Sequence, residues 1–238
     1  MKQFIIEEAF WEVFPKAKIG ILVFKGIDNQ VANQRNYEHD FGQILRSAEA
    51  QATSYFTEDE FSQNTVVKVW RDAFQKFKTK KGARSSIEAL LKRVKSGNSI
   101  GCINPLVDIY NSISLKYALP CGGEDIDTFV GDVRLTKATG NEDFITLGTD
   151  EAAPPFEGEI VYKDDAGAIC RCWNWRESVR TMLTEETKNA FLCIELVDES
   201  REEVLTQALK ELSELTQKYL GGTFEVYVLD GSHNRIEI

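Results

Sequence analysis

Histidine and cysteine are scarce in this chain of 238 residues, which contains two histidines and five cysteines. His39 and His233 lie in no recognisable motif, so the sequence predicts neither a histidine-based catalytic triad nor a histidine metal site. The cysteines are odd in number and lack the spacing of a disulfide framework. Cys170 and Cys172 form a C-x-C pair without further metal ligands nearby. We therefore expect buried thiols, no bound metal and no other cofactor.

Long hydrophobic runs are absent as well. No run approaches the roughly 18–20 residues that cross a bilayer, and Glu7 and Glu8 interrupt any signal-peptide core near the start. Hydrophobic residues nevertheless make up 42% of the chain, which is enough for a sizeable core. We therefore expect a cytoplasmic protein with no membrane partner, folded as a single domain over residues 1–238.

Hydrophobic periodicity predicts mainly helices in the first half of the chain and mainly strands in the second. The predicted helices cover residues 7–14, 34–54, 66–77, 86–96, 106–117 and 200–215. The predicted strands cover residues 19–24, 130–135, 144–147, 159–162, 169–173, 191–197 and 224–229. The expected N-caps of the last three helices are Ser85 or Ser86, Asn104 and Ser200. This separation of helices from strands favours an α+β fold over a doubly wound one.

Positive charge is concentrated between residues 68 and 95. This basic segment contains ten Lys and Arg residues and two acidic ones, whereas the whole chain carries a net charge of −10. Such asymmetry is typical of a phosphate-binding face, and a helix N-terminus near residues 84–86 would favour an anion. The alternative is a solvated pair of helices joined by a lysine-rich turn. The candidate RNA contacts are Lys76, Lys78, Lys80, Lys81, Arg84, Lys92, Arg93 and Lys95.

Amides, carboxylates and indoles are concentrated in three short motifs. The motifs are residues 104–111 (NPLVDIYN), 120–125 (PCGGED) and 171–177 (RCWNWRE). Asp108 lies three positions before Asn111 on one helical face, and we expect its carboxylate to bond loop backbone at the turn after the helix. Glu124 and Asp125 follow two glycines. These carboxylates either orient a water or hold an ammonium group in a binding site, or they belong to an ordinary turn.

The two indoles of the third motif have two interpretations. Trp173 and Trp175 alternate along a predicted strand, so they share one face while Asn174 and Arg176 share the other. The indoles form either a buried pair or a stacking wall for a base or an amino-acid side chain. Arg176 either pairs with a carboxylate or holds a phosphate.

The ordered motifs resemble the B3/4 tRNA-editing domain of the phenylalanyl-tRNA synthetase beta subunit, here as a free-standing protein. The resemblance covers roughly residues 80–200. Its anchors are Asp108–Asn111 through Pro120, Arg134–Ala138, Leu147-Gly148, Ile160–Asp164 and Glu186–Asn189 with the strand that follows. The resemblance implies a B3/4 fold, with β-sandwich-like sheets flanked by helices. It also implies an aminoacylated tRNA as the partner, not DNA, without indicating an oligomeric state.

In the synthetase this domain hydrolyses the ester of tRNA mischarged with tyrosine. Asn111 matches the family's pocket asparagine, and Tyr110 stands where the family has threonine. The family histidine falls on Gly122. The glutamate that reads the tyrosine hydroxyl aligns with Cys193, and Glu195 lies two residues further along the same strand face. A site built around that hydrogen bond depends on it for discrimination, so we expect a substrate other than tyrosine.

The motifs and the resemblance together give the expected site. The expected catalytic residues are Asn111, Glu124 and Asp125. The expected substrate-binding residues are Tyr110, Asn111, Trp173, Asn174, Cys193 and Glu195. Asn111 is also compatible with a purely structural role, because buried amides commonly bridge backbone groups.

Three functions are compatible with this sequence. The first is a deacylase that clears mischarged tRNA in trans. Because neither Ser85 nor Ser86 lies in a nucleophile elbow, its chemistry would be attack by a positioned water, assisted by a carboxylate or by the RNA's terminal hydroxyl. The second is a non-catalytic module that binds tRNA, another RNA or an aminoacyl small molecule. The third is a partner-binding protein whose basic segment meets an acidic surface.

Overall fold

The computed structural model describes residues 2–238, which form two β-sheets and six α-helices. The helices are α1 (Glu8–Trp11), α2 (Tyr37–Ala52), α3 (Thr65–Phe74), α4 (Ser86–Lys95), α5 (Pro105–Tyr117) and α6 (Glu202–Leu220). The four-stranded sheet has the order β3 (Cys121–Asp125), β8 (Asn189–Leu196), β2 (Lys18–Lys25) and β9 (Thr223–Leu229). The six-stranded sheet has the order β10 (Arg235–Glu237), β1 (Gln3–Ile6), β4 (Val133–Lys137), β5 (Ile160–Asp164), β6 (Gly167–Arg171) and β7 (Arg176–Glu177).

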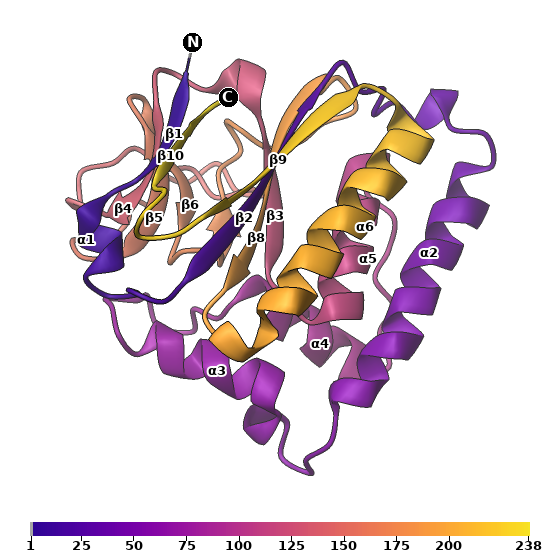
Figure 1. Cartoon of the computed structure of the whole chain (residues 1–238), viewed down its shortest axis with the longest axis horizontal. Coiled ribbons are helices and arrows are strands. Elements are labelled where there is room, and N and C mark those ends of the chain that lie inside the picture. Colours follow the sequence, from indigo (N-terminus) through magenta and orange to yellow (C-terminus); the bar gives the residue numbers. More distant parts are fainter. Residues whose placement is uncertain (1) are drawn as a thin grey trace.

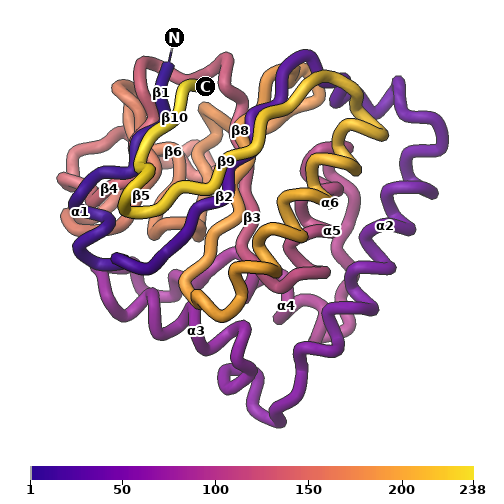
Figure 2. The backbone as a smooth tube through the Cα atoms, viewed as in Figure 1, coloured from indigo at the N-terminus to yellow at the C-terminus, as the bar shows by residue number. Residues whose placement is uncertain are grey.

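The elements form layers. The two sheets pack against each other, and helices cover the other side of the four-stranded sheet (Figure 1). Helix α6 contacts β2 and β8, α5 contacts β3, and α2 packs on α5 from outside. Figure 2 shows that the two ends of the chain meet in the six-stranded sheet, where β1 pairs with β10. The predicted α+β fold, with two sheets flanked by helices, is confirmed.

Strand β2 lies between the two hydrophobic cores. Its residues Ile19, Ile21 and Val23 face the core between the sheets. Leu22 and Phe24 belong instead to the core beneath α5 and α6. Because side chains alternate across a strand, a strand buried on both faces has a continuous hydrophobic sequence. This explains the uninterrupted apolar run, and burial of each such side chain contributes about 1.5–3 kcal/mol.

Local signals fix the starts of the two helices nearest the site. The Ser85 hydroxyl accepts a hydrogen bond from the Glu88 amide and caps α4, at 3.3 Å. The Asn104 side chain accepts from the Val107 amide at 3.1 Å, and Pro105 is the first residue of α5. Both caps satisfy backbone donors that a helix start leaves free. The predictions for these two helix starts are confirmed.

Several predicted elements were wrong. Glu124 and Asp125, with the two glycines before them, were interpreted as part of a loop or turn, but residues 121–125 form strand β3 at one edge of the four-stranded sheet. Residues 144–147 form no strand and make only isolated bridges. The strand predicted over 169–173 ends at Arg171, because Cys172 and Trp173 have left-handed backbones, with φ of 46° and 64°. Trp173 and Trp175 therefore do not alternate along a strand.

The two ends of the chain also differ from the prediction. Helix α6 starts at Glu202, and Ser200 does not cap it. The backbone amide of Ser200 instead donates to the Asp198 carboxylate in the preceding turn. The short strands β1 and β10 were not predicted, because each is only three or four residues long and is held by pairing with distant segments. Helix α1 is shorter than the predicted helix over 7–14.

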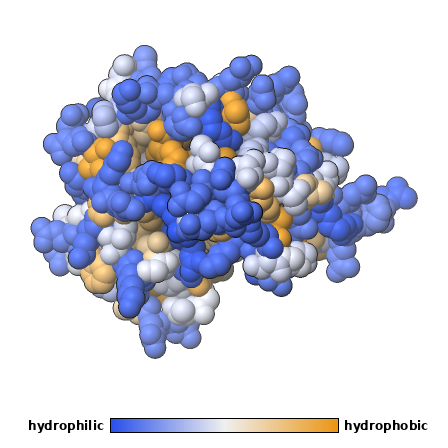
Figure 3. Space-filling view, turned by 90° about the horizontal axis from the view of Figure 1, so that it is seen from below, coloured by the Kyte–Doolittle hydropathy of each residue, from blue (hydrophilic) through white to orange (hydrophobic). Residues whose placement is uncertain are grey.

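One face of the molecule is mainly hydrophilic (Figure 3). Figure 3 views the molecule from below Figure 1 and shows hydrophilic residues over most of that face, with smaller hydrophobic areas between them. Among residues 2–238, no helix combines the length and the hydrophobicity that crossing a bilayer requires. Cys170 and Cys172 are buried free thiols, as predicted.

Candidate functional site

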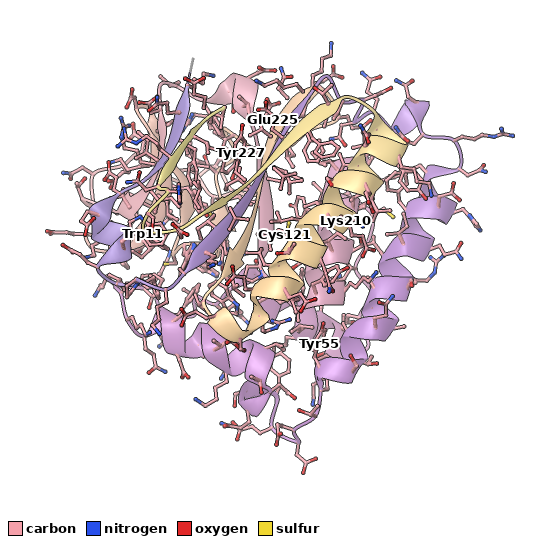
Figure 4. All side chains as sticks on the ribbon, viewed as in Figure 1. Trp11, Tyr55, Cys121, Lys210, Glu225 and Tyr227 are labelled. Atoms are coloured by element: carbon pink, nitrogen blue, oxygen red, sulfur yellow. The ribbon has the colours of Figure 1, made fainter. Side chains whose placement is uncertain are left out.

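A narrow pocket lies between the two sheets, and we call it the acidic pocket. Its wall contains the carboxyl groups of Glu124, Glu177 and Glu195 and the thiols of Cys121, Cys170 and Cys193. The rest of the wall is Ser86, Gly122, Gly123, Tyr162, Trp173, Asn174 and Phe191. The unfilled volume, mouth included, is about 420 Å³. The part of this volume in which the centre of a water molecule fits is only about 40 Å³. The pocket therefore suits a small or slender group. Cys121, labelled in Figure 4, lies on β3 near the middle of the molecule.

Among the three carboxylates of the acidic pocket, Glu195 has the most hydrogen bonds. Strand β8 places it inside the sheet packing, where it is only 1% exposed. The Tyr162 hydroxyl donates to its Oε1 at 2.6 Å, and the Asn174 side-chain amide donates to its Oε2. Burial raises the pKa of Glu195 to about 7, while these hydrogen bonds act in the opposite direction.

Glu124 and Glu177 differ from Glu195 because, in the described part of the chain, neither accepts a side-chain hydrogen bond of good geometry; the donor near Glu124 is the Thr181 hydroxyl, which lowers its pKa. Glu124 is 7% exposed, and its Oε2 is buried and unpaired. Glu177 is half-buried at the pocket wall. Burial raises the pKa of Glu177 to about 7, and burial followed by the nearby charge of Glu177 raises the pKa of Glu124 well above its ordinary value. A carboxyl group with a pKa near 7, such as that of Glu177, can take up and give up protons near neutral pH.

Two adjacent glycines in β3 have different surroundings. A Cβ atom at Gly122 would lie 3.6 Å from Oε1 of Glu177, an ordinary contact. A Cβ atom at Gly123 would lie 2.1 Å from Cδ2 of Leu192, which is too close for any packed side chain. Gly122 therefore leaves space beside a pocket carboxylate, whereas Gly123 is required for packing.

Trp173 belongs to the core and to the pocket wall at once. Its side chain is fully buried against Phe10, Phe14 and Trp70, with ring centroids 4.6–5.1 Å apart. Its indole Nε1 is buried without a hydrogen-bond acceptor of good geometry. This packing makes Trp173 a buried indole that also lines the pocket.

Asn174 connects the pocket with helix α4. Its side-chain oxygen accepts a hydrogen bond from the Ser86 amide at 3.2 Å, while its side-chain nitrogen donates to Glu195. The left-handed turn at Cys172 and Trp173 places Asn174 in this position. The start of α4 and the pocket carboxylate are therefore coupled through one amide side chain.

The structure brings five of the predicted site residues together in the acidic pocket. They are Glu124, Trp173, Asn174, Cys193 and Glu195. Tyr110 lies behind the pocket wall, where burial and the charge of Glu177 raise its pKa well above the ordinary value. Asn111 is buried on α5 and is not part of the pocket wall.

Two predicted acidic residues have structural partners. The Asp125 carboxylate accepts from the Thr187 hydroxyl at 2.7 Å and from the Asp127 amide at 2.9 Å, and it does not line the pocket. Asp108 accepts from the Tyr37 hydroxyl at 2.5 Å and from the Ile103 amide at 2.8 Å. The loop that Asp108 bonds therefore precedes α5 instead of following it.

Sequence reasoning missed several members of the pocket, above all Glu177. Tyr162, Cys170 and Cys121 were also missed as site residues. They come from four different strands, so no local spacing connects them. The one available signal was that Glu177 ends the third polar motif and Cys121 follows the proline that begins the second.

The basic segment forms α3, α4 and the loop between them. Seven of the eight candidate RNA contacts are exposed, and Arg84 is half-buried. The other two basic residues of the segment form ion pairs, Lys68 with Asp72 and Arg71 with Glu88, whereas the eight candidates form none within residues 2–238. Their charge is therefore available to a polyanion.

A groove lies between α3 and α4, and we call it the basic groove. Its wall includes Arg84, Lys92, Thr79 and Trp70, and its unfilled volume with the mouth is about 850 Å³. Ser85 lines this groove, and the next residue, Ser86, lines the acidic pocket. The start of α4 thus separates a cationic groove from a carboxylate-lined pocket.

Within residues 2–238, no group of three or more His, Cys, Asp or Glu side chains is arranged to hold a metal ion. The three thiols of the pocket are all protonated at neutral pH, because burial raises the pKa of each well above its ordinary value. The carboxyl groups of the pocket can transfer protons and accept hydrogen bonds.

Comparison with known proteins identifies the family. Residues 69–221 match the family model of the B3/4 domain. This match covers more than half of the chain, so the chain belongs to the B3/4 domain family.

Two relatives belong to a tRNA synthetase subunit. The chain is 33% identical over 117 residues to the phenylalanine–tRNA ligase beta subunit of Mycoplasmoides gallisepticum, a match that covers 49% of this chain and 14% of the subunit. An N-terminal fragment of the phenylalanyl-tRNA synthetase beta subunit from Pyrococcus horikoshii is similar in structure, with a TM-score of 0.49 and 12% identity. That match covers 93% of this chain and 49% of the fragment. The chain therefore spans only a small part of the first relative and about half of the second.

Proposed function

We propose that this protein is a trans-acting deacylase that hydrolyses the ester of a mischarged tRNA. The observation that carries the proposal is the position of the acidic pocket directly beside the basic groove, with the start of α4 between them. The groove and the exposed basic residues suit the phosphates of an RNA. The pocket suits the small aminoacyl group at the end of that RNA. Membership of the B3/4 family supports this assignment.

The proposed reaction is direct attack by water. Glu177 is half-buried, has no side-chain partner and has a pKa of about 7, which suits a general base near neutral pH. It takes a proton from the water as the water oxygen bonds to the ester carbonyl carbon. The carbon–oxygen bond to the tRNA then breaks, and the tRNA hydroxyl leaves with that proton. The Nε1–H of Trp173 has no acceptor of good geometry, although the Glu195 carboxylate lies near it, and it suits the negative charge that develops on the carbonyl oxygen.

The decisive experiment is a deacylation screen against correctly and incorrectly charged tRNAs. The proposed base is tested by Glu177→Gln, which we expect to lower the rate by about 10²–10³-fold because it removes general-base catalysis. The matched control is Glu203→Gln, an exposed acid at the start of α6. Full activity in Glu177→Gln would exclude this residue as the base, and inactivity of the wild type on every charged tRNA would exclude the deacylase.

The pocket also predicts the kind of amino acid. Its narrow interior and the thiol of Cys193, at the position where the family glutamate aligns, suit a side chain smaller than tyrosine. We expect tyrosyl-tRNA to be hydrolysed more slowly than at least one ester of a smaller amino acid. Preference for tyrosine in the same screen would contradict this specificity.

A non-catalytic RNA-binding module is the second candidate, and the residues at family positions favour it specifically. Gly122 occupies the position of the family histidine, and Asn111 lies outside the pocket wall. A deacylase in which Asn111 takes part should lose more rate than tRNA affinity in Asn111→Ala. Unchanged deacylation in a folded Asn111→Ala variant would instead assign this residue a structural role.

Both candidates require the basic segment to bind RNA. Replacing Lys78, Lys80 and Lys81 by Glu should weaken tRNA binding and reduce the dependence of binding on salt. With fewer phosphate contacts, binding releases fewer counterions from the RNA. The measurement is filter binding over a range of salt concentrations. An unchanged slope would remove these three lysines from the RNA-binding surface.

A further inference from the structure

We propose that the acidic pocket recognises a protonated primary amine, and that Glu124 is the group that receives it. The inference rests on the proposed function, in which the amine belongs to the aminoacyl ester. It goes further, because it makes a free amine a requirement for binding.

The charge of the pocket points to a cationic ligand. Its wall contains three carboxyl groups and no Lys, Arg or His. The guanidinium of Arg180 lowers the pKa of Glu124, but it is engaged elsewhere, since it donates to both oxygens of Asp164 at 2.9 and 2.7 Å. The chain therefore leaves the carboxyl groups of the pocket without a cationic partner, and a bound cation would supply one.

Buried atoms without a hydrogen bond of good geometry point to a ligand independently of the charge. In the pocket wall they are Oε2 of Glu124, Nε1 of Trp173 and the Ser86 hydroxyl. The Thr181 hydroxyl lies near Glu124, and the Glu195 carboxylate lies near Trp173. Nearly all buried polar atoms in proteins are paired, so an unpaired donor and an unpaired acceptor in one narrow pocket are unusual. An α-amino ester carries both complements, an ammonium group for Glu124 and a carbonyl oxygen for Trp173.

The alternatives to an organic amine fit less well. A metal ion would need several ligands around one point, and no such group of side chains exists within residues 2–238. Glu195 is a weaker receptor than Glu124, because Tyr162 and Asn174 already donate to its two oxygens. An amine needs only one or two carboxylates and donates up to three hydrogen bonds.

The groups around Glu124 determine how protons accompany binding. Those that act on it or are acted on by it are Glu177 of β7, Asp125 of β3, Arg180 and Thr181 after β7, Tyr110 of α5, Cys170 of β6 and Cys193 of β8. Arg180 is the one cation among them. Because burial and Glu177 raise the pKa of Glu124, an entering ammonium group should lower that pKa and displace a proton.

The experiment uses the full chain without tRNA, so that it is independent of deacylation. The probes are L-alanine methyl ester, its N-acetyl derivative and methyl L-lactate, titrated at pH 6.5 by NMR and by calorimetry in two buffers of different ionisation enthalpy. We expect the free amine to bind at least about 10-fold more tightly than either neutral probe, with release of protons. Equal binding of the N-acetyl ester, or uptake of protons, would overturn the proposal.

Two variants assign the receptor. Glu124→Gln keeps the shape and removes the charge, and it should abolish the preference for the free amine, whereas Glu203→Gln should keep it. A preference retained in Glu124→Gln would overturn the role of Glu124. If Glu124→Gln does not fold, the comparison of the wild type with its neutral probes still decides whether an amine is recognised, and Glu177→Gln then tests the second unpaired carboxyl group.

A further probe identifies which amine is held. N-acetyl-2,3-diaminopropionate methyl ester has a blocked α-amine and a free side-chain amine. Weaker binding than alanine methyl ester assigns the site to the α-ammonium, and tighter binding assigns it to a cationic side chain. Amine selectivity without any deacylation would sustain this inference and refute the enzyme, while deacylation without amine selectivity would do the reverse.

Discussion

Two buried acidic residues in the strand-rich half of the molecule, Glu159 and Glu124, differ in whether a cationic side chain pairs with them. Glu159 is fully buried, and Arg171 donates to its two oxygens at 3.1 and 2.5 Å. Arg171 is itself 2% exposed, and it also donates to the Ala153 carbonyl at 2.7 Å. Glu124 is almost as buried, at 7% exposure, and it has no such partner.

The difference shows which buried carboxylate has no cationic partner within the described residues. Burying a carboxylate costs free energy wherever it happens, and a paired, hydrogen-bonded cation offsets that cost. At Glu159 the offset comes from within the chain, so the pair is part of the structure. At Glu124 the Thr181 hydroxyl and the charge of Arg180 offset only part of that cost, so its pKa stays well above the ordinary value. Functional sites show such perturbed carboxyl groups more often than structural ones. Four predictions test this comparison.

The largest expected effect is on the paired acid. Arg171→Met should destabilise the fold by about 3–5 kcal/mol, because it leaves the charge of Glu159 buried and unpaired. Chemical denaturation measures the free energy of unfolding. The control is Arg176→Met, which removes an exposed guanidinium that lies 5.1 Å from the ring of Trp175. That change should cost less than about 1 kcal/mol, and equal losses in the two variants would contradict a structural role for the Arg171–Glu159 pair.

A smaller effect concerns the pH dependence of stability. The pKa of Glu195 is raised from 4.5 to about 7 in the folded chain, so the folded state holds this proton more tightly than the unfolded state does. Its contribution is fully present below pH 4.5 and is lost as the pH rises through about 7. Between pH 5 and pH 8 the wild type should lose roughly 2–3 kcal/mol more stability than Glu195→Gln loses. Parallel pH profiles for the two proteins would show that Glu195 is not perturbed.

The third effect distinguishes the two sides of strand β3. Gly123→Ala should destabilise the fold by about 1–3 kcal/mol, because its Cβ would overlap Leu192. Gly122→Ala should change stability by less than about 0.5 kcal/mol, since its Cβ reaches only an ordinary contact with Glu177. Thermal unfolding of both variants measures the contrast. A large loss in Gly122→Ala would mean that the space beside Glu177 is part of the packing and not of a pocket.

The smallest expected effect sharpens the contrast with Glu159. Glu124→Gln should change the free energy of unfolding at pH 7 by less than about 1 kcal/mol, because the buried Oε2 of Glu124 accepts no hydrogen bond of good geometry that the substitution would remove. Denaturation alongside Arg171→Met provides the comparison. A loss as large as that of Arg171→Met would show that Glu124 is a structural acid with an internal partner.

The elements that the sequence determined are those with local causes. Periodicity and caps act within one or two turns, so α4 and α5 start where Ser85 and Asn104 predict. The apolar run of β2 determined a strand buried on both faces. The positive charge of the basic segment could also be predicted from the sequence, because it depends on composition alone.

The tertiary structure decided the strands and turns without local signals. Strand β3 contains two glycines and two acids, which are poor strand formers, and it exists because it pairs with β8 from Cys121 to Asp125. The left-handed backbone at Trp173 is held by packing against Phe10, Phe14 and Trp70. Neither set of partners is near in sequence.

The composition of the site divides in the same way. The polar motifs and the family resemblance placed Glu124, Cys193 and Glu195 in the site, and the pocket contains them. The same reasoning could not distinguish Asp125 from Glu177. The Asp125 carboxylate accepts a hydrogen bond from the Thr187 hydroxyl, whereas Glu177 lines the pocket without a side-chain hydrogen bond in the described residues. Whether an acid is structural or free depends on the partners that other strands bring to it. Sequence therefore determined which chemical groups the protein has, and only the packing of the two sheets decided which of them remain without a partner.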